Sequence, residues 1–261
     1  MKRPRVVYGK SPLIEVIIQL RFPTIFSINN RDPDIFQDRI KSIFPSYFLT
    51  YDKPAIQIPV MAEKNTIPVP PMMENPPIKN HAFVSVDGKT KINLTSGFIS
   101  ISTLSYSRWE QLLDSFRLPL SVLKEIYAPS FFSRIGLRYV EAYSRHNLGL
   151  DGTPWNELIG QPWLGASAYE NEQKLLSSGM DVEYSLNDQK TSFARIHTGL
   201  GTINEIPERV FVVDSDFINS SVVPTENCFD VLEFLHKKAK DFINEVILDK
   251  LHLAMQPERI E

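Results

Sequence analysis

Apolar and polar residues alternate along several stretches of the chain, most clearly from Ile14 to Phe22 (IEVIIQLRF). Every second residue of this stretch is apolar, and Glu15, Gln19 and Arg21 lie between the apolar positions. Successive side chains of a strand point to opposite faces, so the pattern predicts a strand with one buried face. Similar patterns, with hairpin turns at Asp87-Gly88 and Asn187-Asp188, predict strands at residues 82–86, 92–94, 98–103, 134–143, 180–186, 192–197 and 209–217.

Apolar residues spaced three to four apart predict the helices. Asp32-Pro33 combines an N-cap residue with a proline at the first helical position, and it predicts a helix of about three turns. Ser107 and Glu110 have the spacing of a capping box, and a long apolar stripe follows them. The last helix is predicted to run from about 227 to 253.

The predicted elements follow the same order in two parts of the chain, residues 1–130 and 131–261. Each part contains a strand, a helix, two or three further strands and a closing helix, and Leu20-Arg21-Phe22 resembles Leu137-Arg138-Tyr139. We therefore predict an α+β fold built from two similar halves. It would have one or two mainly antiparallel sheets, helices on one side and a long C-terminal helix.

Seven prolines lie between Lys53 and Asn80. This density is incompatible with a helix or a central strand. The sequence predicts a short strand at 55–61 and then a proline-rich loop at about 62–80. Two interpretations stay open for the loop: a plain surface connection, or an arm that grips a partner.

The composition narrows the kind of protein. The chain has 261 residues, 43% of them hydrophobic and 23% charged, which suffices for a globular core without disulfides or metals. Its formal net charge of -3 creates no general attraction to nucleic acid, so a nucleic-acid partner is not expected. The single cysteine, Cys228, excludes an internal disulfide, and no apolar run reaches the about 20 residues of a membrane span. We expect a cytoplasmic protein with no cofactor.

Several phrases of the sequence are similar to one bacterial family. They are Tyr8 with Ser11-Pro12-Leu13-Ile14-Glu15-Val16, Ile43-Phe44-Pro45, Leu137-Arg138-Tyr139-Val140, and Leu235-His236 to Phe242. Over nearly its whole length the chain resembles the sporadically distributed, uncharacterised TIGR04255 family. That family has no assigned activity, so the resemblance implies no chemical role for any residue. Its patchy distribution would fit a role beside mobile elements or in phage defence.

Arginines inside apolar strands are the first candidates for a binding site. No phosphate-binding glycine loop or hydrolase nucleophile motif occurs in the sequence. Arg21, Arg138 and Arg195 each lie within a predicted strand, and guanidinium groups on one sheet can converge on a carboxylate or phosphate. The alternative is that each arginine pairs with a nearby acid such as Glu15 or Glu141.

Paired carboxylates are the second candidates. Asp214 and Asp216 are alternate residues of a predicted strand, so they share a face on which they could hold Mg²⁺. Glu183, on a neighbouring strand, would complete the metal site of a phosphodiesterase or nuclease. A solvated sheet face gives the same alternation and is the competing interpretation.

The sequence favours a non-enzymatic binding or interaction protein. Its partner would be a small anionic ligand bound by the three arginines, or a protein bound through the sheet face and the proline-rich loop. A metal-dependent phosphodiesterase or nuclease is the second hypothesis. Exposed sheet edges and the long last helix also favour a homodimer.

Overall fold

A computed structural model describes residues 3–52, 77–168, 174–202 and 209–259. Most strands in these ranges belong to a single large sheet. They are β2 (Leu13–Arg21), β3 (Ser46–Asp52), β4 (Ile78–Val84), β5 (Thr90–Leu94), β6 (Phe98–Thr103), β7 (Arg134–Tyr143), β8 (Ser178–Ser185), β9 (Ser192–Thr202) and β10 (Arg209–Asn219). Their order across the sheet is β3-β4-β5-β6-β2-β7-β10-β9-β8, and each neighbouring pair is antiparallel.

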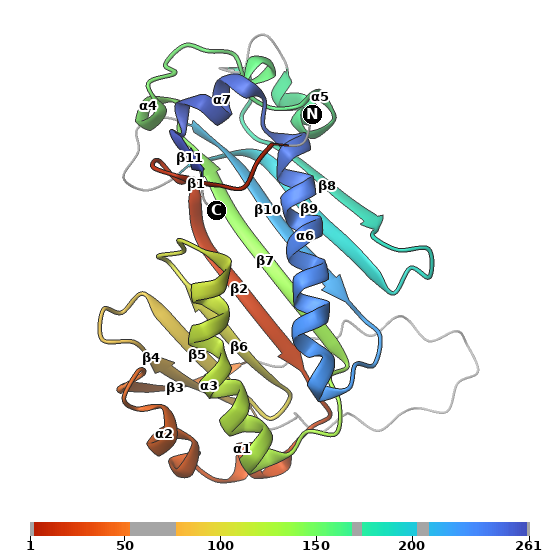
Figure 1. Ribbon diagram of the computed structural model, residues 1–261. Helices are drawn as coiled ribbons and strands as arrows, with labels where there is room; N and C mark the ends of the chain where they lie inside the picture. The colour runs from red at the N-terminus through yellow and green to blue at the C-terminus, as the bar shows by residue number, and fades with distance from the viewer. Residues whose placement is uncertain (1–2, 53–76, 169–173, 203–208, 260–261) are drawn as a thin grey trace, which may run out of the picture.

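Two long helices, α3 (Trp109–Tyr127) and α6 (Cys228–Val246), lie across one face of this sheet (Figure 1). The predicted α+β fold, with a mainly antiparallel sheet and helices on one side, is confirmed. The shorter helices are α1 (Phe26–Asn30), α2 (Asp34–Ile40), α4 (Arg145–Leu148), α5 (Gln161–Leu164) and α7 (Asp249–Ala254). None of the described helices is long and apolar enough to cross a membrane.

The alternation seen in the sequence decides which side chains enter the core. In β2, Val16, Ile18 and Leu20 are fully buried, whereas Gln19 between them is partly exposed. The buried positions pack with the apolar stripes of the helices into one hydrophobic core. We call the opposite side of the sheet the open face.

The two halves of the chain meet at the centre of the sheet. β2 pairs with β7, while β6 pairs with β2 on one side and β10 pairs with β7 on the other. α3 follows β6 in the chain, and α6 follows β10. Residues 1–130 and 131–261 therefore contribute to one continuous sheet.

The chain ends form a second, two-stranded sheet. β1 (Val6–Tyr8) pairs with β11 (Pro257–Arg259), and Val7 lies opposite Glu258. Figure 1 shows the N-terminal segment crossing the helix-bearing face between α3 and α6. This pairing holds the first residues of the chain over the central strands β2 and β7, toward the end of the sheet near α7 (Figure 1).

The prediction of one continuous helix to residue 253 is wrong. α6 ends at Val246, and the next residue, Ile247, is extended with φ -92° and ψ 134°. Ile247 forms an isolated β-bridge with Ile159, and the backbone N–H of Leu248 donates to the carbonyl of Leu158 at 2.8 Å. These contacts with a distant loop satisfy the backbone outside the helix, so the chain turns before α7.

Part of the proline-rich region can be placed. The strand predicted at 55–61 and residues 62–76 of the loop lie outside the described residues. Residues 78–80 belong to β4, so the loop ends before 80. The sequence pattern did not predict β3, which pairs with β4 along its whole length.

Gly199 allows β8 and β9 to approach closely, and its replacement with alanine is expected to destabilise the protein. A Cβ at this position would lie 2.2 Å from the backbone oxygen of Ser178. Because backbone atoms must move to relieve that overlap, Gly199→Ala should lower the free energy of unfolding by about 1–3 kcal/mol. Gly97→Ala is the matched control, since a methyl group added there would meet no heavy atom within 4 Å beyond its chain neighbours. Urea titrations of both variants measure the difference, and equal stabilities would contradict the expectation.

Candidate functional site

The three predicted arginines lie on the open face of the sheet. Arg138 and Arg195 line one open hollow there, together with Asp214, Asp216 and Glu183, but Arg21 does not belong to it. Arg21 lies opposite Arg134 in the β2–β7 pairing, whereas Arg138 lies opposite Ile17. The four-residue offset along β2 separates the two positions by about 13 Å. Arg195 lies two strands away from Arg138, on β9.

Each of these arginines already has a partner. The guanidinium of Arg138 donates to both carboxylate oxygens of Asp214. The Nε of Arg195 donates to Glu183 at 2.5 Å, and the Nε of Arg21 donates to the amide oxygen of Gln19 at 3.0 Å. Pairing with a local partner thus describes these residues better than a shared anion site.

The partners differ from those that the sequence suggested. Arg138 and Glu141 are three residues apart on one strand, so their side chains point to opposite faces. Arg138 is on the open face and Glu141 is buried on the helix side. The neighbouring strand β10 supplies the acid for Arg138 instead.

The three carboxylates of the metal hypothesis are also engaged by arginines. Asp216 accepts a hydrogen bond from Arg134 at 2.7 Å, and Asp214 and Glu183 are the partners described above. Burial raises the pKa of Asp216, and the two nearby arginines oppose that shift. Among the described residues, no group of three or more His, Cys, Asp or Glu side chains is placed to hold a metal ion.

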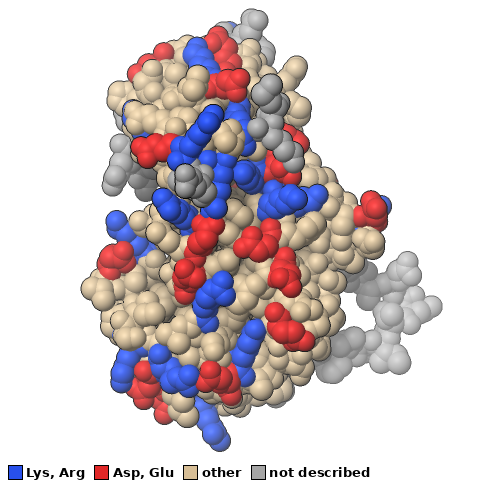
Figure 2. Space-filling view, in the orientation of Figure 1, with Lys and Arg blue, Asp and Glu red and all other residues tan. Residues whose placement is uncertain are grey.

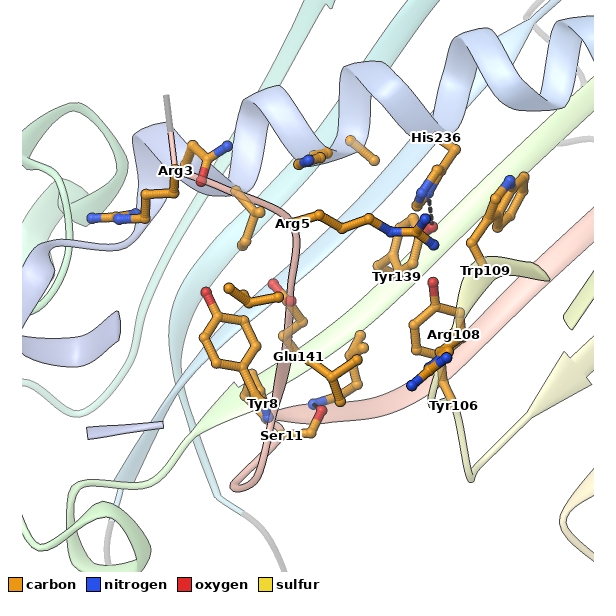
Figure 3. A pocket seen from close by; sticks show the side chains of 18 of the residues that line it. Arg3, Arg5, Tyr8, Ser11, Tyr106, Arg108, Trp109, Tyr139, Glu141 and His236 are labelled. Carbon is orange, nitrogen blue, oxygen red and sulfur yellow. Dashed lines mark hydrogen bonds between the residues drawn. The ribbon is translucent and has the colours of Figure 1, made fainter. Parts of the chain in front are cut away.

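A more enclosed cavity lies on the other side of the sheet, beneath the N-terminal segment (Figure 3). Its volume is about 190 Å³. β7 contributes Tyr139 and Glu141 to its wall, α6 contributes His236, and the start of α3 contributes Trp109. Residues 3–8 cover it, because the β1–β11 pairing fixes them there. We call this space the helix-face cavity.

One end of the helix-face cavity is aromatic. The His236 ring stacks on Trp109, with ring centroids 4.3 Å apart and planes 7° from parallel. The hydroxyl of Tyr139 is hydrogen-bonded to Nδ1 of His236 at 2.9 Å, and the indole N–H of Trp109 donates to Glu233 at 2.6 Å. Burial lowers the pKa of His236 to about 4, and the nearby Arg5 adds to the shift. The imidazole is therefore neutral at pH 7.

The other end contains a buried acid. Only 8% of Glu141 is exposed, and its Oε2 accepts a hydrogen bond from the hydroxyl of Tyr143 at 3.0 Å. Burial raises the pKa of Glu141 to about 7, although the Tyr143 bond acts in the opposite direction. No basic side chain pairs with Glu141 among the described residues.

Basic side chains surround the cavity. Arg3, Arg5, Arg108 and Lys240 line it. Arg5 pairs with Glu110, so Glu110 does not form the capping box predicted with Ser107, and the Ser107 hydroxyl bonds to Gln111 instead. Figure 2 shows lysines and arginines gathered on this face near the N-terminal segment.

Two of these cations have no acidic partner within the parts of the chain that the structure describes. Neither Arg108 nor Lys240 forms an ion pair with any residue in the described ranges. Arg3 donates to Asp249 at 2.7 Å through Nη2, but its Nη1 is buried without a hydrogen-bond partner in the described part of the chain. The cavity wall therefore has unused capacity to bind negative charge.

Sequence patterns did not lead to this site, although two signals for it exist. In β7 the buried alternation of Leu137 and Tyr139 continues to Glu141, which places a carboxyl at a core position. In α6, His236 adjoins the apolar stripe that contains Leu232 and Leu235. An ionisable residue at a core position is a candidate for function, because burial there costs free energy.

The fold and this cavity define a class: an α+β protein with one large antiparallel sheet and a cavity between that sheet and its two long helices. No family model and no curated protein matches the chain. The resemblance to the TIGR04255 family stays a prediction.

Proposed function

We propose that the chain is a non-enzymatic binding protein whose ligand is a small organic anion held in the helix-face cavity. The observation that supports this proposal most is the charge of the cavity wall. Among the described residues that line the cavity, four are basic and one is acidic: Arg3, Arg5, Arg108 and Lys240, against Glu141. An anion in the cavity would meet Arg108 and Lys240 without displacing an acidic partner from the described part of the chain. Charge-assisted hydrogen bonds of this kind are stronger than neutral ones.

The size of the cavity limits the ligand. An apolar protein cavity of about 150 Å³ accommodates a benzene molecule. The helix-face cavity has about 190 Å³, so it suits one ring with one or two small substituents. Tyr106, Trp109 and Tyr139 supply aromatic surface for such a ring.

The second hypothesis, a metal-dependent phosphodiesterase or nuclease, gains no support from the described residues. Asp214, Asp216 and Glu183 each pair with an arginine, which already compensates the negative charge that a cation would need. A cytoplasmic location and a homodimer stay predictions from the sequence.

A thermal-shift measurement with benzoate tests the proposed function. Millimolar benzoate is expected to raise the melting temperature of the wild-type protein, because it binds only the folded state. Arg108→Ala should reduce this stabilisation. The variant is expected to fold normally, since Arg108 is exposed and lies at the start of a helix, where a positive charge is unfavourable.

Arg195→Ala is the matched control, because it removes an arginine from the open face. Its response to benzoate should equal that of the wild type. Equal loss of the benzoate effect in both variants would indicate general charge screening and overturn the assignment to the cavity. Absence of any benzoate effect in the wild type would overturn the proposed function for ring acids of this size.

A further inference from the structure

We infer that the ligand of the helix-face cavity is amphoteric: a small ring acid that also carries an amino group, which the carboxyl of Glu141 binds. This inference rests on the proposed function and specifies its ligand. It depends on two features of the cavity wall among the described residues. One is a buried acid that has no basic partner, and the other is a set of basic side chains that have no acidic partner.

The first feature is the buried acid, Glu141. A carboxylate has about four acceptor positions, but Glu141 receives one hydrogen bond, from Tyr143 to Oε2. Its Oε1 has no partner among the described residues, and Glu141 belongs to the cavity wall. Burial and the Tyr143 bond are the influences on its protonation, so no neighbouring arginine or lysine compensates its charge.

The second feature is the set of basic side chains on the cavity wall. Figure 3 shows the Arg5 side chain running away from Glu141 toward Tyr139 and His236, and Arg108 lies beside Tyr106. The Arg5 and Arg108 side chains therefore lie toward the end that holds Tyr139 and Tyr106. Glu141 lies nearer Tyr8, on the side where Arg3 enters, and Arg3 is not among the groups that shift the pKa of Glu141. A ligand that lies along the cavity can reach both ends at once.

A ligand that carries only a negative charge would pair with the basic side chains but not with Glu141. Its acidic group would bind near Arg108, but its other end would leave Glu141 desolvated and unpaired, which costs free energy. An amino group at that end would donate to Oε1 of Glu141 and, as an ammonium ion, would supply the missing cation. The aromatic ring of Tyr8, which also lines the cavity, would pack against the same group.

Three ring compounds of nearly equal size test the inference by calorimetry at pH 7. They are 4-(aminomethyl)benzoate, 4-methylbenzoate and 4-methylbenzylamine. The aminomethyl acid is expected to bind the wild-type protein at least about tenfold more tightly than 4-methylbenzoate, as a hydrogen bond to a charged group provides. In Glu141→Gln this advantage should fall to less than about threefold, while 4-methylbenzoate should bind at least as tightly as it binds the wild type, because no unpaired carboxylate remains beside it.

A measurement on the wild type alone guards against a folding defect in Glu141→Gln. Burial raises the pKa of Glu141 to about 7, so binding of an ammonium group next to its carboxyl should release part of a proton at pH 7. Titrations in two buffers of different ionisation enthalpy detect this proton. The aminomethyl acid should release it, and 4-methylbenzoate should not.

The outcomes separate the inference from the proposed function. Equal binding of the two acids, weakened for both by Arg108→Ala, would leave the anion site standing and overturn the role of Glu141. Binding of 4-methylbenzylamine alone, unaffected by Arg108→Ala, would support the Glu141 site and overturn the anionic ligand. No binding of any of the three compounds would overturn both.

Discussion

Replacing Glu141 with glutamine is expected to stabilise the protein, relative to the wild type, increasingly as the pH rises from about 4.5 to about 7. Burial raises the pKa of Glu141 from its usual 4.5 to about 7 in the folded protein. Between these values the folded state keeps a proton that the unfolded state has lost, so the wild type loses stability as the pH rises. The loss is roughly 3 kcal/mol across the window. Glutamine carries no titrating group and removes this slope.

Urea titrations of the wild type and Glu141→Gln between pH 4 and pH 8 measure the effect. Tyr143→Phe provides an internal control, because the Tyr143 hydroxyl lowers the pKa of Glu141. Removing that hydroxyl should extend the pH-dependent window upward without abolishing it. Parallel stability curves for the wild type and Glu141→Gln would show that Glu141 is not held protonated by burial.

Replacing His236 with phenylalanine is expected to stabilise the protein, relative to the wild type, as the pH falls from about 6.5 to about 4. Burial lowers the pKa of His236 from 6.5 to about 4. In this window the unfolded state binds a proton that the folded state excludes, so the wild type loses stability as the pH falls, by roughly 3 kcal/mol in total. Phenylalanine keeps a ring against Trp109 but cannot bind a proton, so that loss disappears.

The two groups act in opposite directions between about pH 4.5 and pH 6.5. In the wild type their contributions to the pH dependence nearly cancel there, since Glu141 favours low pH and His236 favours high pH. Glu141→Gln should expose the His236 slope, His236→Phe should expose the Glu141 slope, and the double variant should show neither. Unfolding curves that give single-variant slopes of the same sign would refute this account of the cavity.

Local patterns were enough to predict much of the secondary structure. β7 has the bounds expected for residues 134–143, because alternation of apolar and polar side chains is a property of neighbouring positions on one strand. The hairpin predicted at Asp87-Gly88 forms between β4 and β5, because a tight turn depends only on its own few residues. Gly88 adopts the positive φ of +71° that favours glycine in such a turn. The one-sided helices follow from the apolar stripes on α3 and α6.

Contacts between distant segments decided the rest. The end of α6 at Val246 depends on a bridge from Ile247 to Ile159, and no pattern within the helix encodes that contact. The partner of Arg138 depends on which strand lies beside β7, and that strand is β10, whose Asp214 is 76 residues further along the chain.

The sequence by itself determined the α+β class, the central strands and the one-sided helices, since these depend on residues two to four positions apart. Only the tertiary structure decided where a ligand can bind. The helix-face cavity joins Arg5, Trp109, Glu141 and His236, which come together because the chain ends pair as β1 and β11 and the two halves share one sheet. Glu141 was visible in the sequence as a charge at a core position, but its neighbours across the cavity were not.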